Sequence, residues 1–248
     1  MIDLGALDVE RGRDGRRIAA LMPDYVAEHQ IVSALNAHRV TVSAAQGRDS
    51  DSVWVLSPRP IQVGRIRIVP SRGAAEPGAL RLLDTKAFGT GLHATTALCL
   101  AVLDETVQPG SPRAVLDVGT GSGVLALAAL TLGVPEALGI DVDDEALRVA
   151  EENARLNGLS DRLQLVRGGP EITTGMWPLI VANVLAAPLI EMAPALVQRV
   201  AHHGELVLSG IPSSVEEQVT QTYRRLGMHR IAVKSRDGWV ALVFRASW

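Results

Sequence analysis

Hydrophobic and polar residues alternate in a regular pattern over the second half of the chain. Short apolar runs that suit buried strands are separated by longer segments with helical periodicity, which is typical of a doubly wound parallel sheet. The predicted strands cover residues 113–118, 136–141, 162–167, 178–183 and 204–210. The predicted helices cover residues 122–132, 143–157, 187–200 and 214–226.

The chain closes with a pattern of a different kind. Two further strands, at residues 229–235 and 239–245, are separated only by the "RDG" tripeptide, and such a short connection favours an antiparallel hairpin. The helix before this hairpin has Ser213 or Ser214 as its expected cap, because Glu216 and Glu217 follow. We therefore predict an α/β fold with a mostly parallel sheet of seven strands.

The pattern is weaker in the first hundred residues, and we expect a separate small region at residues 1–57 ahead of a main domain at residues 58–248. The elements predicted in the first half are a helix at 23–37 that begins with Pro23, a strand at 39–43, a polar linker at 44–52, and strands within "IQVGRIRIVPS" and "GALRLLDT".

Composition excludes several classes of protein. The 248 residues include 47% hydrophobic residues, carry a formal net charge of -3 and contain one cysteine, Cys99. We expect a globular, cytoplasmic protein without a signal peptide or a membrane-spanning segment. A net negative charge argues against a nucleic-acid binder, a single cysteine excludes an internal disulfide, and six scattered histidines suggest no metal site.

A glycine-rich turn follows the first strand of the main domain. In "VLDVGTGSG", residues 115–123, Gly119, Gly121 and Gly123 let the backbone turn tightly and approach a ligand at the start of a helix. Asp141 ends the next strand, 22 residues after Gly119, a spacing at which a carboxylate can accept the hydroxyls of a ribose. The two features together predict a nucleoside-binding site.

Two details of this turn distinguish between nucleoside cofactors. The spacing is G-x-G-x-G, whereas the dinucleotide fingerprint has two residues before its third glycine. Asp117 would repel a pyrophosphate and suits a cationic ligand, which favours S-adenosylmethionine with its sulfonium and amino groups.

Two further segments of the sequence contribute candidate polar residues to this binding site. Asn183 closes the fourth strand at the same sheet edge, and the residues after it, "VLA", differ from the prolines and aromatic common in enzymes that methylate nucleobases. In "AFGTGLHATT", residues 87–96, Gly89 and Gly91 allow a loop to close, and we expect Thr95 or Thr96 to cap the next helix.

These segments, together with "ALGIDVDDEALRVAEENARLNGL" and "GWVALVF", resemble the PrmA family of bacterial methyltransferases, which modify ribosomal protein L11 on lysine and terminal amines. The resemblance runs from about residue 58 to the end and implies a class I methyltransferase fold with a ligand-covering loop at residues 87–96. The predicted contacts of S-adenosylmethionine are Phe88, Gly89, Thr96, Asp117, Gly119, Gly121, Asp141 and Asn183.

The resemblance also implies an enzyme that places Phe88 and His93 near the methyl group. His93 is our candidate base, and its simpler interpretation is a helix-start residue with local hydrogen bonds. Asn183 is our candidate for orienting the amine. Only about 57 residues precede the resemblance, fewer than in full-length members with their ferredoxin-like domain, so another protein lysine or a small-molecule amine stays open as substrate. A non-catalytic cofactor-binding domain and, less well supported, a nicotinamide-dependent oxidoreductase are further alternatives.

Overall fold

The computed structural model describes residues 8–11, 18–21, 31–33, 60–72, 76–83 and 93–248. The chain divides into two compact units, Met1–Pro58 and Arg59–Trp248. In the first unit, β1 (Asp8–Arg11) pairs antiparallel with β2 (Ile18–Leu21), and residues 31–33 are helical. The hydrophobic pattern did not predict β1 or β2. The rest of the helix predicted at 23–37, the strand at 39–43 and the linker at 44–52 lie outside the described residues.

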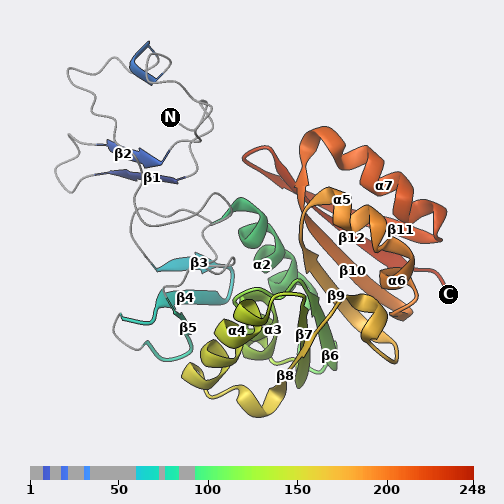
Figure 1. Cartoon of the computed structure of the whole chain (residues 1–248), viewed down its shortest axis with the longest axis horizontal. Coiled ribbons are helices and arrows are strands. Elements are labelled where there is room, and N and C mark those ends of the chain that lie inside the picture. Colours follow the sequence, from blue (N-terminus) through green and yellow to red (C-terminus); the bar gives the residue numbers. More distant parts are fainter. Residues whose placement is uncertain (1–7, 12–17, 22–30, 34–59, 73–75, 84–92) are drawn as a thin grey trace. The chain divides into compact units, whose positions relative to one another are not determined.

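The second unit is built on a seven-stranded sheet (Figure 1), as predicted. Five neighbouring strands run parallel, and β12 lies antiparallel between β10 and β11. In spatial order the strands are β11 (Met228–Arg236), β12 (Trp239–Ala246), β10 (Val200–Pro212), β9 (Trp177–Asn183), β6 (Ala114–Val118), β7 (Glu136–Asp141) and β8 (Leu163–Arg167).

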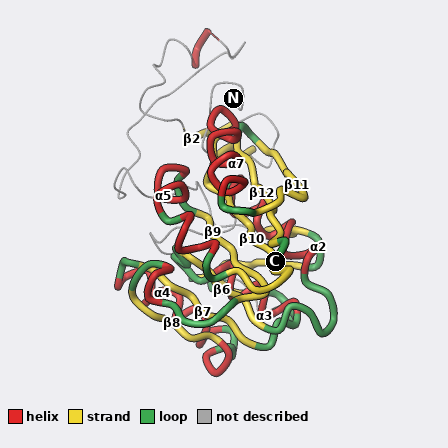
Figure 2. The backbone as a smooth tube through the Cα atoms, turned by 90° about the vertical axis from the view of Figure 1, so that its right-hand side faces the viewer, coloured by secondary structure: helices red, strands yellow, loops and turns green. Residues whose placement is uncertain are grey.

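Helices cover both faces of this sheet (Figure 2), and each face has its own hydrophobic core. Because successive side chains of a strand point to opposite faces, Val115 belongs to one core and Leu116 to the other. The first core includes residues of α2 (Ala94–Thr106), α3 (Val124–Leu132) and α4 (Asp144–Leu156). The second includes residues of α5 (Ala186–Glu191), α6 (Ala193–Val197) and α7 (Glu216–Arg225). Short 3-10 turns lie at Ser160–Arg162, Pro170–Ile172 and Ser213–Val215.

Two helix predictions need correction. The single helix predicted at 187–200 is two helices, α5 and α6, which meet at Met192. Pro194 stands in the first turn of α6. A proline has no N–H to donate to the carbonyl four residues earlier, and its ring clashes with that carbonyl oxygen, so α5 ends before it. Helix α7 has no side-chain cap from Ser213 or Ser214, since both lie in a 3-10 turn before it.

The hairpin prediction is confirmed. Arg236 and Trp239 are the last paired residues of β11 and β12, so the turn itself is Asp237 and Gly238. Both have positive φ, at 50° and 80°, which is the backbone of a tight turn whose twist matches that of the strands.

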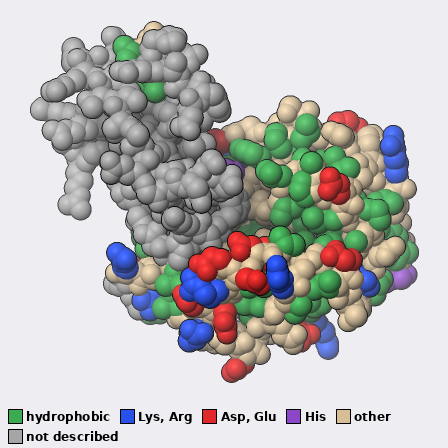
Figure 3. All heavy atoms as spheres, viewed as in Figure 1, with side chains coloured by type: hydrophobic (Ala, Val, Ile, Leu, Met, Phe, Trp, Pro, Cys, Tyr) green, Lys and Arg blue, Asp and Glu red, His purple; other side chains and the backbone are tan. Residues whose placement is uncertain are grey.

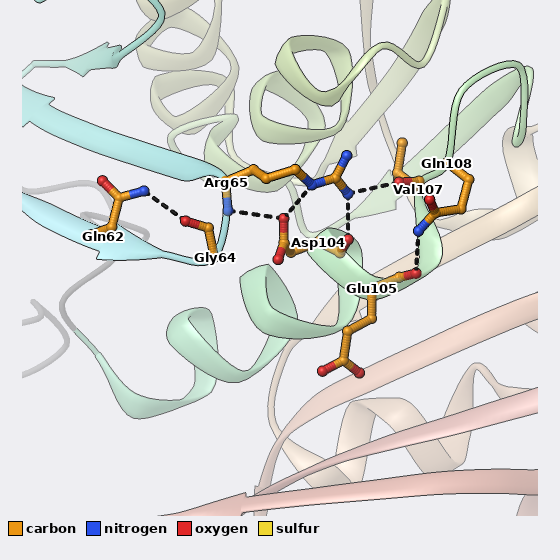
Figure 4. Close-up of polar contacts among 7 residues, drawn as sticks. All are labelled: Gln62, Gly64, Arg65, Asp104, Glu105, Val107 and Gln108. Atoms are coloured by element: carbon orange, nitrogen blue, oxygen red, sulfur yellow. Dashed lines mark hydrogen bonds and ion pairs between the residues drawn. The ribbon is translucent and has the colours of Figure 1, made fainter.

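A small three-stranded sheet packs beside α2. It consists of β3 (Ile61–Val63), β4 (Ile66–Pro70) and β5 (Leu80–Leu82), within the two segments predicted as strands. Arg65, in the β3–β4 turn, ties this sheet to the end of α2 (Figure 4). Its guanidinium donates to Asp104 Oδ1 at 2.8 Å and to the carbonyl of the C-cap residue Val107 at 2.8 Å. It also donates to the Asp104 carbonyl and thus satisfies a carbonyl of the last helical turn. The C-terminal end of α2 is thereby fixed, and its N-terminal end enters the candidate site.

Charged side chains of both signs are interspersed on the face of α4 that Figure 3 presents. Arg148 pairs with Glu145 at 2.6 Å and also with Glu152, at the spacings that place side chains together on a helix surface. In the described part of the chain, no helix is long and apolar enough to cross a membrane.

Candidate functional site

The glycine turn between β6 and α3 adopts a backbone that only glycine accommodates easily. Gly119, Gly121 and Gly123 have φ of 69°, 54° and 79°. A Cβ at Gly119 would also overlap a methyl group of Val184. The amides of Gly119 and Thr120 donate to the Ile140 carbonyl at 2.9 and 3.0 Å, so the turn is held against the end of β7.

Asp117 is buried at the end of β6, directly below this turn. Its Oδ2 accepts from the Thr120 hydroxyl at 2.8 Å and from the Ala126 amide at 3.1 Å, whereas its Oδ1 has no hydrogen-bond partner in the structure. Burial raises the pKa of Asp117 to about 6, against the lowering effect of those two hydrogen bonds. The carboxylate therefore holds the turn and keeps one acceptor oxygen uncommitted.

Asp141 is bound to the same turn. Its Oδ2 accepts from the Gly121 amide at 2.9 Å, and its Oδ1 accepts from the Asp143 amide at 3.1 Å. The acid and the glycine loop, which the sequence placed together by spacing alone, are thus in direct contact at the carboxyl ends of β6 and β7.

Asn183 ends β9, the strand next to β6, and faces helix α2. Its side-chain nitrogen donates to the Thr96 hydroxyl at 3.3 Å, and both side chains are buried. Asn183 Oδ1 has no partner in the structure. Gly210 of β10, with φ of 83°, makes room for the residue after Asn183, because a Cβ there would overlap the backbone of Val184.

His93 is the N-cap of α2, so the expected caps Thr95 and Thr96 are instead the second and third residues of the helix. The imidazole Nδ1 accepts from the Thr95 amide at 3.3 Å and lies 2.8 Å from the Thr95 hydroxyl. Its ring packs edge to face on Trp239, with centroids 5.3 Å apart. Burial lowers the pKa of His93, which favours the neutral ring.

The predicted residues thus fall into two groups. Asp117, Gly119, Gly121 and Asp141 gather at the β6 and β7 ends, and Thr96 and Asn183 meet where α2 approaches β9. Phe88 and Gly89 lie outside the described residues.

The sequence pattern did not predict the contacts of Val184, Gly210 and Trp239, nor that of Asn153, whose side chain donates to the Ser122 carbonyl of the glycine turn at 2.9 Å. Of these four residues, only Asn153 could have been singled out from the sequence, because it is a polar residue in the otherwise apolar buried stripe of α4.

These residues fit S-adenosylmethionine. Asp117 Oδ1 and Asn183 Oδ1 are buried acceptors without a partner, and unpaired buried acceptors favour a ligand that brings N–H donors or positive charge. The bare backbone of Gly119 and Gly121 supplies the space for close approach.

The PrmA family model, described as ribosomal protein L11 methyltransferase, matches residues 10–247. The match therefore begins well before residue 58, where the motif resemblance was expected to start. A ribosomal protein L11 methyltransferase of Pelobacter propionicus is 39% identical over 220 residues, 85% of this chain and 71% of that protein. One of Chromohalobacter salexigens is 42% identical over 203 residues, 80% of this chain and 67% of that protein.

Among solved structures, the ribosomal protein L11 methylase of Lactobacillus delbrueckii subsp. bulgaricus aligns with a TM-score of 0.69 and 31% identity. The alignment covers 76% of this chain and 99% of that one. The chain belongs to the PrmA family and is an S-adenosylmethionine-dependent methyltransferase.

Proposed function

We propose that this chain is a protein N-methyltransferase that modifies lysine and terminal amines of ribosomal protein L11. The names of its relatives support that substrate. The structural observation that carries the proposal is the buried, unpartnered Oδ1 of Asn183, beside Thr96 at the sheet edge that also holds the glycine turn. A carbonyl oxygen in that position can accept an N–H from an incoming amine and so orient its lone pair.

For the cofactor contacts we propose the residues that the sequence predicted. Asp141 would accept the ribose hydroxyls, Asp117 would face the positive charge, and the turn at Gly119 and Gly121 would allow close approach. Thr96 and Asn183 would complete the contacts from the other side, with Phe88 and Gly89 added from the segment outside the described residues. When bound, the cofactor supplies the electrophilic methyl group.

An amine must lose a proton before it can attack. A lysine has a pKa of about 10.4 in water, so the site must favour its neutral form or accept its proton. We assign the acceptor role to His93, whose burial favours the neutral ring. Because Nδ1 accepts from the Thr95 amide, the neutral ring carries its own proton on Nε2. His93 therefore takes up the amine proton at Nδ1, after this nitrogen is released from the amide and the hydroxyl of Thr95.

The region at residues 1–57 is our candidate for substrate recognition, and a ribosomal substrate would place the protein in the cytoplasm. We expect no direct nucleic-acid substrate, because the chain has a net negative charge.

The test is transfer of labelled methyl from S-adenosylmethionine into an extract of cells that lack the gene, followed by separate protease and nuclease digestion. The proposal expects protease-sensitive label in a protein that co-migrates with ribosomal protein L11, and none with the Asn183→Ala variant. Label in another protein or in small molecules would reassign the substrate. Label in nucleic acid would overturn the proposal.

A further inference from the structure

Asn153 of α4 is fully buried and connects two parts of the second unit that are distant in sequence. Its Oδ1 accepts from the Leu83 amide at 2.8 Å, just after β5. Its Nδ2 donates to the Ser122 carbonyl at 2.9 Å, inside the glycine turn. An amide side chain is required here, because one end must accept an N–H and the other must donate to a carbonyl.

Asn157, the C-cap of α4, lies one helical turn after Asn153 and binds β5 itself. Its Oδ1 accepts from the Arg81 amide at 2.8 Å, and its Nδ2 donates to the Arg81 carbonyl and to the Asn153 carbonyl, each at 2.7 Å. The two asparagines therefore anchor β5 and the residue after it to α4, and β5 and α4 lie side by side in Figure 1. The described hydrogen bonds link Asn153, and not Asn157, to the glycine turn.

The hydrogen bond from Asn153 reaches the glycine turn at Ser122, between two glycines whose backbone is already constrained. Ser122 stands between Gly121, whose amide donates to Asp141, and Gly123, which has a positive φ of 79°. Helix α4 also packs closely on Gly123, since a Cβ there would lie 3.1 Å from the Cβ of Ala150. The glycine turn is therefore packed closely against α4, and its Ser122 carbonyl accepts from the buried side-chain amide of Asn153.

We propose that Asn153 is a positioning residue for cofactor binding, which fixes the glycine turn and couples it to the backbone at Leu83. Coupling of this kind is reciprocal, so a cofactor that orders the turn also strengthens the hydrogen bond at Leu83. The inference rests on the use of S-adenosylmethionine by this enzyme.

The first test compares three proteins by calorimetric titration with S-adenosylmethionine. Asn153→Asp keeps an acceptor for the Leu83 amide and loses the donor to Ser122, whereas Asn157→Ala releases β5 without touching the turn. We expect Asn153→Asp to weaken cofactor binding by tenfold or more, and Asn157→Ala to change it less than twofold at a comparable loss of thermal stability. Equal effects of the two variants on cofactor affinity would overturn the inference.

The second test uses the unmodified protein and so does not depend on the folding of a variant. Amide hydrogen exchange is followed at Leu83 and Arg81 with and without S-adenosylmethionine. We expect the cofactor to slow exchange at Leu83 at least fivefold more than at Arg81. An identical response at the two amides would overturn the coupling. Failure of the unmodified protein to bind the cofactor is a separate result, which would contradict the proposed function itself.

Discussion

Asn183 and Thr96 lie 87 residues apart in the sequence, and their side chains meet at 3.3 Å in a buried contact between β9 and α2. The Thr96 hydroxyl accepts from the side-chain nitrogen of Asn183, and this hydrogen bond turns the side-chain oxygen of Asn183 away from Thr96. The oxygen left unpartnered is Oδ1, which is the atom that can accept an N–H from an amine.

Removal of the Thr96 hydroxyl should therefore lower turnover. In Thr96→Val the side chain keeps its volume, but Asn183 loses the partner that orients it, and we expect kcat to fall roughly 10- to 100-fold. Steady-state kinetics with saturating cofactor measures this effect. Thr220→Val is the control, since Thr220 is equally buried but lies in α7 and accepts from Arg230. Similar kcat values for the two variants would show that the Thr96 hydroxyl does not position Asn183.

The lack of a side chain at Gly119, which leaves room for Val184, can be tested by substitution. Gly119→Ala introduces a strained φ of 69° and a methyl group that overlaps Val184, whereas Gly158→Ala has nearly the same φ, 66°, and open space. We expect the Gly158 variant to lose about 1 kcal/mol of unfolding free energy, from backbone strain alone. The Gly119 variant should lose clearly more and bind cofactor weakly, as measured by urea unfolding and calorimetry. Equal losses of stability would mean that the turn adapts without disturbing Val184.

The central fold was predictable because its signals are local. The strand pattern at 136–141 coincides with β7, and Asp141 at its end contacts the glycine turn through the Gly121 amide. The break at Met192 was also visible in Pro194, but the apolar periodicity on both sides favoured one helix.

Contacts between distant segments were not predictable from those signals. That Gly210 makes room for the backbone of Val184, or that Trp239 packs on His93, depends on how the strands align in three dimensions. The N-cap of α2 was assigned to a threonine because threonine is the commoner cap, whereas the structure uses His93.

The stability of the protein should depend on Asp117 with a definite sign. Its folded pKa of about 6 lies above the ordinary value of 3.8, so the folded state binds more protons between these pH values. Stability from this group is therefore present below pH 3.8 and lost as the pH rises through about 6. Relative to the unmodified protein, Asp117→Asn should gain stability as the pH rises from 3.8 to about 6, and the gain should reach about 3 kcal/mol above that range.

The same variant should bind S-adenosylmethionine less tightly, because it lacks the negative charge. Denaturant unfolding at pH 5 and pH 7.5, with calorimetry at pH 7.5, measures both effects. If the difference in stability between the variant and the unmodified protein were the same at pH 5 and at pH 7.5, the raised pKa would be wrong.

His93 has the opposite dependence on pH. Burial lowers its pKa below the ordinary 6.5, so the unfolded chain binds more protons and stability is lost as the pH falls below about 6.5. His93→Asn keeps a good helix cap and removes the loss of stability at low pH. His93→Ala also removes that loss, but it should lower the free energy of unfolding by about 1 kcal/mol because the helix cap is lost. Both variants should show reduced kcat if His93 accepts the amine proton. Unchanged kcat in both would leave His93 as a helix cap alone.

The central claim is most directly tested by incubating the purified protein and S-adenosylmethionine with purified ribosomal protein L11, followed by mass spectrometry of its peptides. The account predicts mass increments of whole methyl groups on lysine side chains or the terminal amine, absent when Asn183 is replaced by alanine. An unmodified ribosomal protein L11, under conditions in which the enzyme binds the cofactor, would contradict the account.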